Sequence, residues 1–133
     1  MKYFTINELT HSTVAKAQNI DNSPCFNVIG ALTSLTDNVL DPLREAFGSA
    51  IRVNSGYRCP DLNKAVGGAS ASQHLRGEAA DISAGSTEGN RRMFDLAIKL
   101  KLPFDQLIDE HGYRWLHISH RKGVNRNQIL HIK

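Results

Sequence analysis

The sequence predicts an α+β fold in a single domain, with a small, mostly antiparallel sheet flanked by helices. Segments with helical periodicity and segments with strand alternation occur in separate groups, and two of the expected strands are close enough to form a hairpin. A chain of 133 residues is long enough to bury one core without help from disulfides. No internal repeat, linker or low-complexity run divides it. We therefore treat residues 1–133 as one domain.

The first half of the chain is expected to be mostly helical. Residues 5–9 form a short segment that Thr5 or Asn7 would cap, and residues 11–24 are polar enough for a short helix followed by a loop. Between residues 27 and 47, apolar side chains recur at steps of three and four, which predicts a helix with one buried face. Pro42 lies inside that segment, so we expect a kink or a restart there, with Asp41 as the new cap, and a stop at Gly48.

Strands dominate the second half. Residues 51–55 alternate between apolar and polar, and residues 78–83 form a second candidate strand; a short helix over residues 61–66 lies between them. Ser86 begins a helix that extends to Leu100. Residues 104–110 and 115–119 are then expected to pair as a hairpin, and residues 129–132 are expected to add an edge strand.

Composition and charge narrow the range of partners. Hydrophobic residues make up 41% of the sequence, charged residues 22%, and the formal net charge is +3. Basic residues are scattered except in the tail, residues 121–133, which would suit attraction to an anionic polymer such as a bacterial cell wall. Because the sequence shows no recognised nucleic-acid module or aromatic stacking platform, we expect no nucleic-acid partner.

The N-terminal residues lack the apolar run of a secretion signal, and no stretch is long and apolar enough to span a bilayer. We therefore expect cytoplasmic synthesis without a signal peptide, no membrane partner, and a monomer. Cys25 and Cys59 lack CxxC spacing, so both are expected to be reduced.

Two histidines and one aspartate form a candidate metal-binding set. His74 and Asp81 lie seven positions apart, and His117 lies in the second hairpin strand, where alternation places its ring opposite Leu116 and Ile118. An aspartate buried among the apolar neighbours of position 81 would need a partner, and a metal ion would neutralise it. Two neutral imidazoles and one carboxylate leave the fourth position of a zinc ion open, as in catalytic sites. The sequence therefore predicts a zinc hydrolase with one zinc ion.

Three ordered motifs link this set to a known family. They are Ser55-Gly56-Tyr57-Arg58, then Ser72-x-His74-x-x-Gly77-x-Ala79-x-Asp81, and then Trp115-x-His117. In this order they resemble the zinc D-alanyl-D-alanine metallopeptidases, which include D,D-carboxypeptidases, D-Ala-D-Ala dipeptidases and phage endolysin peptidases. The resemblance covers about residues 26–120, and the small phage- and prophage-type members look most similar because they share the run from Phe104 to Ile108.

The resemblance implies roles for the motif residues. The zinc ligands would be His74, Asp81 and His117. Arg58 would steady the substrate carbonyl or the developing oxyanion, and Ser72 would contact the peptide. Tyr57 is assigned to substrate binding as well, with packing in the core as the alternative.

The sequence departs from the family at the general base. Several relatives place a glutamate three residues before the last zinc histidine, but this position is Arg114, which cannot accept a proton. Our candidate is Glu110. With a four-residue turn over residues 111–114, Glu110 would lie diagonally from His117 on one face, about 7–8 Å away between Cα atoms.

Three alternatives for the base remain open. A three-residue turn would direct Asp109 toward the site in place of Glu110. His120 is the next candidate, and His111 the last.

The sequence as a whole predicts a zinc peptidase that acts on D-alanine-containing peptidoglycan stem peptides, as a D,D-carboxypeptidase or a cross-link endopeptidase. A zinc-activated water would attack the peptide carbonyl, Glu110 would take its proton, and Arg58 would stabilise the tetrahedral oxygen. Without a signal peptide, the protein would reach the cell wall after lysis or as part of a phage particle. The alternative is a non-catalytic zinc-containing module for wall binding or for a phage particle, because the arginine at position 114 is not a base.

Overall fold

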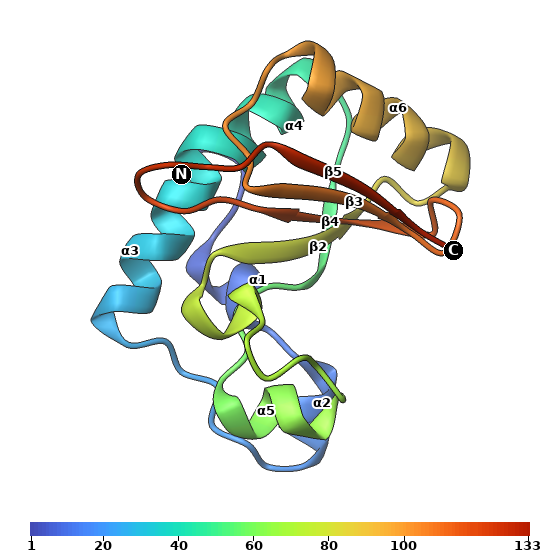
Figure 1. Ribbon diagram of the computed structural model, residues 1–133. Coiled ribbons are helices and arrows are strands. Elements are labelled where there is room, and N and C mark those ends of the chain that lie inside the picture. Colours follow the sequence, from blue (N-terminus) through green and yellow to red (C-terminus); the bar gives the residue numbers. More distant parts are fainter.

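The computed structural model describes residues 1–133 and is organised around a five-stranded sheet (Figure 1). The strands are β1 (Arg52–Ser55), β2 (Ala79–Ser83), β3 (Gln106–Glu110), β4 (Trp115–Ser119) and β5 (Gln128–Ile132). Their order in the sheet is β1-β2-β4-β3-β5. Three pairings are antiparallel, and β3 and β5 run parallel. The predicted α+β class with a mostly antiparallel sheet is confirmed.

Helices pack around this sheet. They are α1 (Ile6–Thr10), α2 (Thr13–Ala17), α3 (Phe26–Leu35), α4 (Asp41–Phe47), α5 (Pro60–Ala65) and α6 (Thr87–Lys99), with a π-helical turn η1 (Thr36–Leu40) and a 3₁₀ turn η2 (Gln73–Arg76). Helices α4 and α6 lie side by side, and α6 packs against β3 and β4, while α2 and α5 pack together at the other end (Figure 1). None of the helices combines the length and the apolar content that crossing a bilayer requires.

The helical segment from residue 26 to 47 is continuous, and this corrects the expected restart at Asp41. The backbone stays helical from α3 through η1 into α4. Pro42 has no N–H to donate, and the wide turn η1 directly precedes the helix that contains it. Asp41 does not cap a helix; its carboxylate accepts hydrogen bonds from the backbone N–H groups of Lys2 and Tyr3 and so attaches the N-terminus.

Side-chain alternation gives the sheet one apolar face and one polar face. The apolar face of β2 and β4 carries the fully buried side chains Ala80, Ile82, Leu116 and Ile118. Asp81 and His117 lie between them in sequence and therefore project from the opposite face. The register aligns Asp81 with His117, and His117 with Ile108. One row of side chains thus crosses three strands on the polar face.

The β3–β4 hairpin has a four-residue turn, which is the one of the two considered turn lengths that favours Glu110. Glu110 pairs with Trp115, and Ile108 pairs with His117. The N–H of Arg114 donates to the Glu110 carbonyl at 3.0 Å, which closes the turn. This register places Glu110 on the same face of the sheet as His117.

The C-terminal segment is part of the folded domain. Strand β5 was expected at a sheet edge, and it lies there, parallel to β3. At its first residue, the backbone N–H of Gln128 donates to the Asp105 carbonyl at 2.9 Å, and just before the strand the backbone N–H of Arg126 donates to the Asp105 carboxylate at 3.0 Å. Arg126 is therefore held against Asp105, the residue just before β3.

Candidate metal centre and active-site cleft

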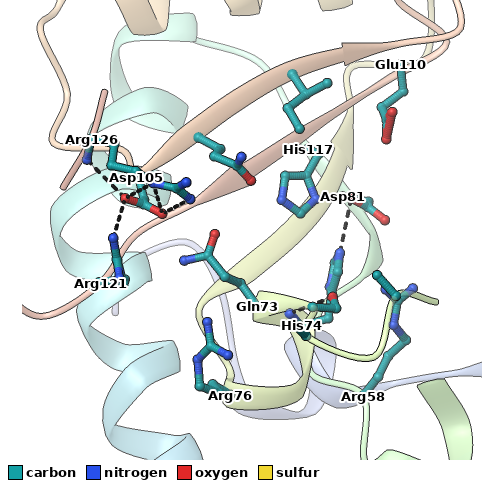
Figure 2. Close-up of a pocket in the computed structure, with 15 residues that line it drawn as sticks. Arg58, Gln73, His74, Arg76, Asp81, Asp105, Glu110, His117, Arg121 and Arg126 are labelled. Atoms are coloured by element: carbon teal, nitrogen blue, oxygen red, sulfur yellow. Dashed lines mark hydrogen bonds and ion pairs between the residues drawn. The ribbon is translucent and has the colours of Figure 1, made fainter. Parts of the chain in front are cut away.

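The side chains of His74, Asp81 and His117 converge on the polar face of the sheet (Figure 2). They come from η2, β2 and β4, and one ligand atom from each lies within 4.8 Å of the others. His74 Nε2 is 3.3 Å from Asp81 Oδ1, and His117 Nδ1 is 3.1 Å from the same oxygen. The structure therefore brings together the three predicted ligands, and their atoms could hold one metal ion.

Local hydrogen bonds hold His74 in the orientation that a ligand requires. The Ser72 hydroxyl caps η2 by accepting a hydrogen bond from the His74 N–H at 3.1 Å, and Gly77 ends the turn in a left-handed conformation, with φ of 74°. His74 Nδ1 lies 2.7 Å from the carbonyl oxygen of Gly56. Because a carbonyl can only accept, Nδ1 carries the hydrogen, and the lone pair of Nε2 is directed toward Asp81.

Glycine is needed at position 56 to allow this contact. A Cβ on Gly56 would come within 2.1 Å of the Leu9 carbonyl oxygen, far closer than any real Cβ contact. The N–H of the next residue, Tyr57, donates to the same carbonyl at 2.8 Å. The backbone after β1 is thus fixed against α1, and its carbonyl oxygen is available to His74.

The chemistry of Asp81 fits a divalent cation. Burial raises the pKa of Asp81, but the close contacts with the imidazoles of His117 and His74 outweigh this effect and hold the pKa far below its usual range. The carboxylate is therefore ionised, mostly buried, and faced by two imidazoles. A cation between the three side chains would neutralise Asp81 and accept the imidazole lone pairs. Two nitrogen donors and one oxygen donor form a set that suits zinc.

Arg58 lies beside the ligands. Its backbone N–H donates to the backbone carbonyl of His74 at 3.0 Å, which couples the positions of the two residues. Burial lowers the pKa of the Arg58 guanidinium, and the negative charge of Asp81 opposes this shift. Its Nε is buried without a hydrogen-bond partner, and Nη1 makes one long contact of 3.5 Å with the Ser55 hydroxyl. The guanidinium thus keeps donors for an oxygen of a bound molecule.

Glu110 lines the same cleft as the three ligands (Figure 2). Burial raises the pKa of the Glu110 carboxyl, and the nearby negative charge of Asp81 raises it further, against a smaller opposite effect of His117. A raised pKa makes the carboxylate a stronger base, and its face of the sheet is the one that carries His117. Position and basicity are therefore both suitable for proton transfer.

The structure places the alternative bases elsewhere. Asp109 is buried on the other face of β3, where its carboxylate contacts His131 Nδ1. His120 Nδ1 donates to the Pro103 carbonyl at 2.6 Å, and its Nε2 lies 3.1 Å from the Ser34 hydroxyl. Both side chains are engaged outside the cleft, and neither lines it.

The remaining predicted site residues separate into two groups. Ser72 lines the cleft, although its hydroxyl also caps η2. Tyr57 is buried in the core and lines a neighbouring hollow with Arg58, so the cleft is lined without it. His111 lies exposed in the β3–β4 turn, with its ring centroid 5.1 Å from that of Trp115.

The cleft has a volume of about 570 Å³ and includes polar residues that the sequence reasoning missed. They are Gln73, Arg76, Asp105, Gln106, Arg121 and Arg126. Strand alternation offered a signal for Gln106, because it lies two and four residues before Ile108 and Glu110 on one face. The arginines gave no such signal, since residues 121–126 are basic and polar without a strand or helix period.

Comparison with known proteins agrees with this geometry. The chain matches the family described as Peptidase M15 over residues 2–119, a range that contains all three candidate ligands. It is also 50% identical over 48 residues to a protein named "Zinc D-Ala-D-Ala carboxypeptidase" from Streptomyces albus G. That match covers 35% of this chain and 19% of the relative, so the chain corresponds to about a fifth of the relative's length. Since the family match extends over most of its length, the chain belongs to the peptidase M15 family.

Proposed function

We propose that this protein is a zinc-dependent peptidase that hydrolyses D-alanine-containing peptidoglycan stem peptides. The observation that carries the proposal is the meeting of His74, Asp81 and His117 in a cleft that Glu110 and Arg58 also line. Membership of the peptidase M15 family supports peptide hydrolysis, and the similarity to a zinc D-Ala-D-Ala carboxypeptidase supports the metal and the substrate class.

Each residue has a chemical role in this proposal. The metal ligands would be His74 through Nε2, His117 through Nδ1, and one carboxylate oxygen of Asp81. Zinc in such a site supplies the Lewis acidity that makes water nucleophilic near neutral pH. Glu110 takes a proton from the attacking water and gives it to the leaving amine. Arg58 donates to the carbonyl oxygen as negative charge develops on it, and one donor of this kind contributes roughly 3–4 kcal/mol to lowering the barrier.

The cleft suits a substrate longer than a dipeptide. It extends from Glu110 past the ligands to Arg121 and Arg126, with a volume of about 570 Å³ (Figure 2). This length supports action on a whole stem peptide, either as a D,D-carboxypeptidase or as a cross-link endopeptidase. The protein would meet this substrate in the cell wall, after lysis or as part of a phage particle.

Metal analysis and product analysis together test the proposal. The purified protein should contain one zinc ion per chain, and the zinc-loaded protein should cleave a pentapeptide ending in D-Ala-D-Ala. Mass spectrometry of digested muropeptides then separates the two modes, because release of single D-alanine residues indicates a carboxypeptidase and separation of cross-linked dimers indicates an endopeptidase. Tight zinc binding with no product at high protein concentration would overturn the proposal and favour a non-catalytic zinc-containing module.

A further inference from the structure

The cleft contains a second charged centre, separate from the metal ligands. Figure 2 shows Arg121, Arg126 and Asp105 at one end of the cleft, and the metal ligands at the other end. We name the first group, together with Arg76, the arginine end. Its residues come from η2, from the position just before β3, and from the segment that leads into β5.

Arg126 neutralises the buried carboxylate of the arginine end. Asp105 is fully buried, and it accepts hydrogen bonds from Arg126 Nη2 at 2.8 Å and from Arg126 Nε at 3.2 and 3.3 Å. The Arg126 backbone N–H adds a bond of 3.0 Å to the same carboxylate. These contacts satisfy Asp105, so the other arginines are not required to neutralise it.

Arg121 and Arg76 retain unused donors. Arg121 makes one contact of 3.3 Å from Nη2 to Asp105, and its Nε has no partner. Arg76 donates only from Nε, at 3.0 Å, to Glu78. Both side chains are about half exposed, Arg121 at 42% and Arg76 at 52%. With Arg126 included, the arginine end has three guanidinium groups. They face two carboxylates, those of Asp105 and Glu78, which leaves an excess of one positive charge.

A buried amide lies between the two ends. Gln73 is 9% exposed, and its Oε1 has no hydrogen-bond partner, while its Nε2 makes a long contact of 3.4 Å with Glu78. In Figure 2 its amide group extends into the space between Arg121 and His74. An enclosed acceptor without a donor is uncommon in folded proteins. An N–H of a bound peptide would satisfy it.

We propose that the arginine end binds a carboxylate of the substrate peptide through Arg121 and Arg76, while the scissile bond lies at the metal ligands. This inference rests on the proposed function, because the peptide that spans the cleft is the stem peptide. Guanidinium groups with free donors match a carboxylate in both charge and geometry. Gln73 would accept a hydrogen bond from the peptide backbone between the two contacts.

A stem peptide offers a C-terminal carboxylate and the carboxylate of its internal acidic residue. The arginine beside the metal ligands is Arg58, which makes a backbone hydrogen bond to His74, whereas Arg121 lies at the opposite end of the cleft (Figure 2). A carboxylate next to the scissile bond would lie near Arg58. The internal carboxylate is therefore the one that we expect to reach Arg121.

Calorimetric binding to zinc-loaded Glu110→Gln protein tests this inference with most turnover removed. The probes are L-Ala-γ-D-Glu-L-Lys-D-Ala-D-Ala, the same peptide with the internal carboxylate converted to an amide, and the same peptide with a C-terminal amide. Loss of the internal carboxylate should weaken binding about ten-fold, as expected for a charge-assisted hydrogen bond at a partly exposed site. A loss seen only with the C-terminal amide would identify the terminal carboxylate as the ligand of the arginine end, provided that it also depends on Arg121.

Adding Arg121→Gln should remove the difference in affinity between the unmodified peptide and the peptide with the internal amide, and leave the affinity for the latter unchanged. Adding Arg76→Gln should reduce this difference. The matched control is Lys122→Gln, which removes the same charge from the next residue, outside this cleft. Equal binding of all three peptides by the Glu110→Gln protein that retains Arg121 would overturn the inference. Equal losses of affinity on adding Arg121→Gln and on adding Lys122→Gln would overturn it as well.

The inference and the proposed function fail in different ways. Hydrolysis of the peptides by the unmodified protein without carboxylate discrimination in binding would contradict the arginine end alone. Discrimination in binding without hydrolysis would contradict the proposed activity alone. If no probe is bound or cleaved, both are wrong.

Discussion

Glu110 pairs with Trp115 at the last register position before the β3–β4 turn, and this pairing determines which acidic side chain reaches the cleft. Successive residues of a strand point to opposite faces, so a shift of one residue would exchange Glu110 for Asp109. In the observed register Asp109 is buried against His131, and Glu110 lines the cleft. The identity of the proposed base is therefore a consequence of turn length.

Replacing Glu110 by Gln should abolish most turnover and retain the metal. Glutamine keeps the shape of the side chain but cannot take a proton, and a general base typically contributes a factor of roughly 10²–10⁴ to the rate. We expect kcat to fall within this range while the zinc content, measured by metal analysis of the purified protein, stays at the wild-type level. Normal turnover in this variant would show that the base is another residue.

Asp109→Asn is the matched control for that experiment. It makes the same chemical change one residue earlier, on the opposite face of β3. Since Asp109 contacts His131 on β5, we expect a lower melting temperature with kcat close to wild type. A loss of turnover equal to that of Glu110→Gln would indicate a general effect on β3.

Arg58→Gln should reduce kcat much more than it raises KM. The proposed role of Arg58 is to bind the oxyanion, whose charge develops only in the transition state, so its loss affects the chemical step. We expect a decrease in kcat of roughly 10²–10³-fold from steady-state kinetics on a D-Ala-D-Ala peptide. A rise in KM with unchanged kcat would instead assign Arg58 to ground-state binding of the substrate.

Removing the metal should lower stability as well as activity. A ligand that binds only the folded protein stabilises it according to its concentration and affinity, so chelation should lower the melting temperature by roughly 5–10 °C and added zinc should restore it. His117→Ala should lose this zinc-dependent shift. The matched control is His111→Ala, because that histidine is exposed in the turn and should leave the shift unchanged. An identical response of the two variants would exclude His117 as a ligand.

Much of the site followed from local sequence patterns. Alternation in β4 predicted that His117 leaves the apolar face, and a four-residue turn, one of the two turn lengths considered, predicted that Glu110 shares the face of His117. The cap at Ser72 and the left-handed conformation of Gly77 are local as well, and together they set the two ends of η2, the turn that contains His74. These features depend on neighbours within a few residues, which is the range that a sequence pattern describes.

Other features depend on contacts between distant segments. Asp41 accepts hydrogen bonds from the backbone N–H groups of Lys2 and Tyr3, 39 and 38 residues earlier in the chain, and this contact reflects how the N-terminus packs against α4. The arginine end depends on the parallel pairing of β5 with β3, which brings Arg126 to Asp105 across 21 positions. No periodicity in a polar segment indicates which buried carboxylate it will reach.

Asp105→Asn should destabilise the protein at neutral pH and have less effect in acid. Hydrogen bonds from Arg126 lower the pKa of Asp105 below its ordinary value of 3.8, and this outweighs the opposite effect of burial. Because the folded-state pKa is lowered, the unfolded chain binds the proton more readily, and the stabilisation is complete above about pH 4 and is lost as the pH falls further. We expect the melting temperature of the variant at pH 7 to be lower than that of wild type by roughly 5 °C, with a smaller difference at pH 3. Thermal unfolding of both proteins across this pH range measures the difference. A difference of the same size at both pH values would mean that the contact depends on the shape and hydrogen bonds of the side chain and not on its charge.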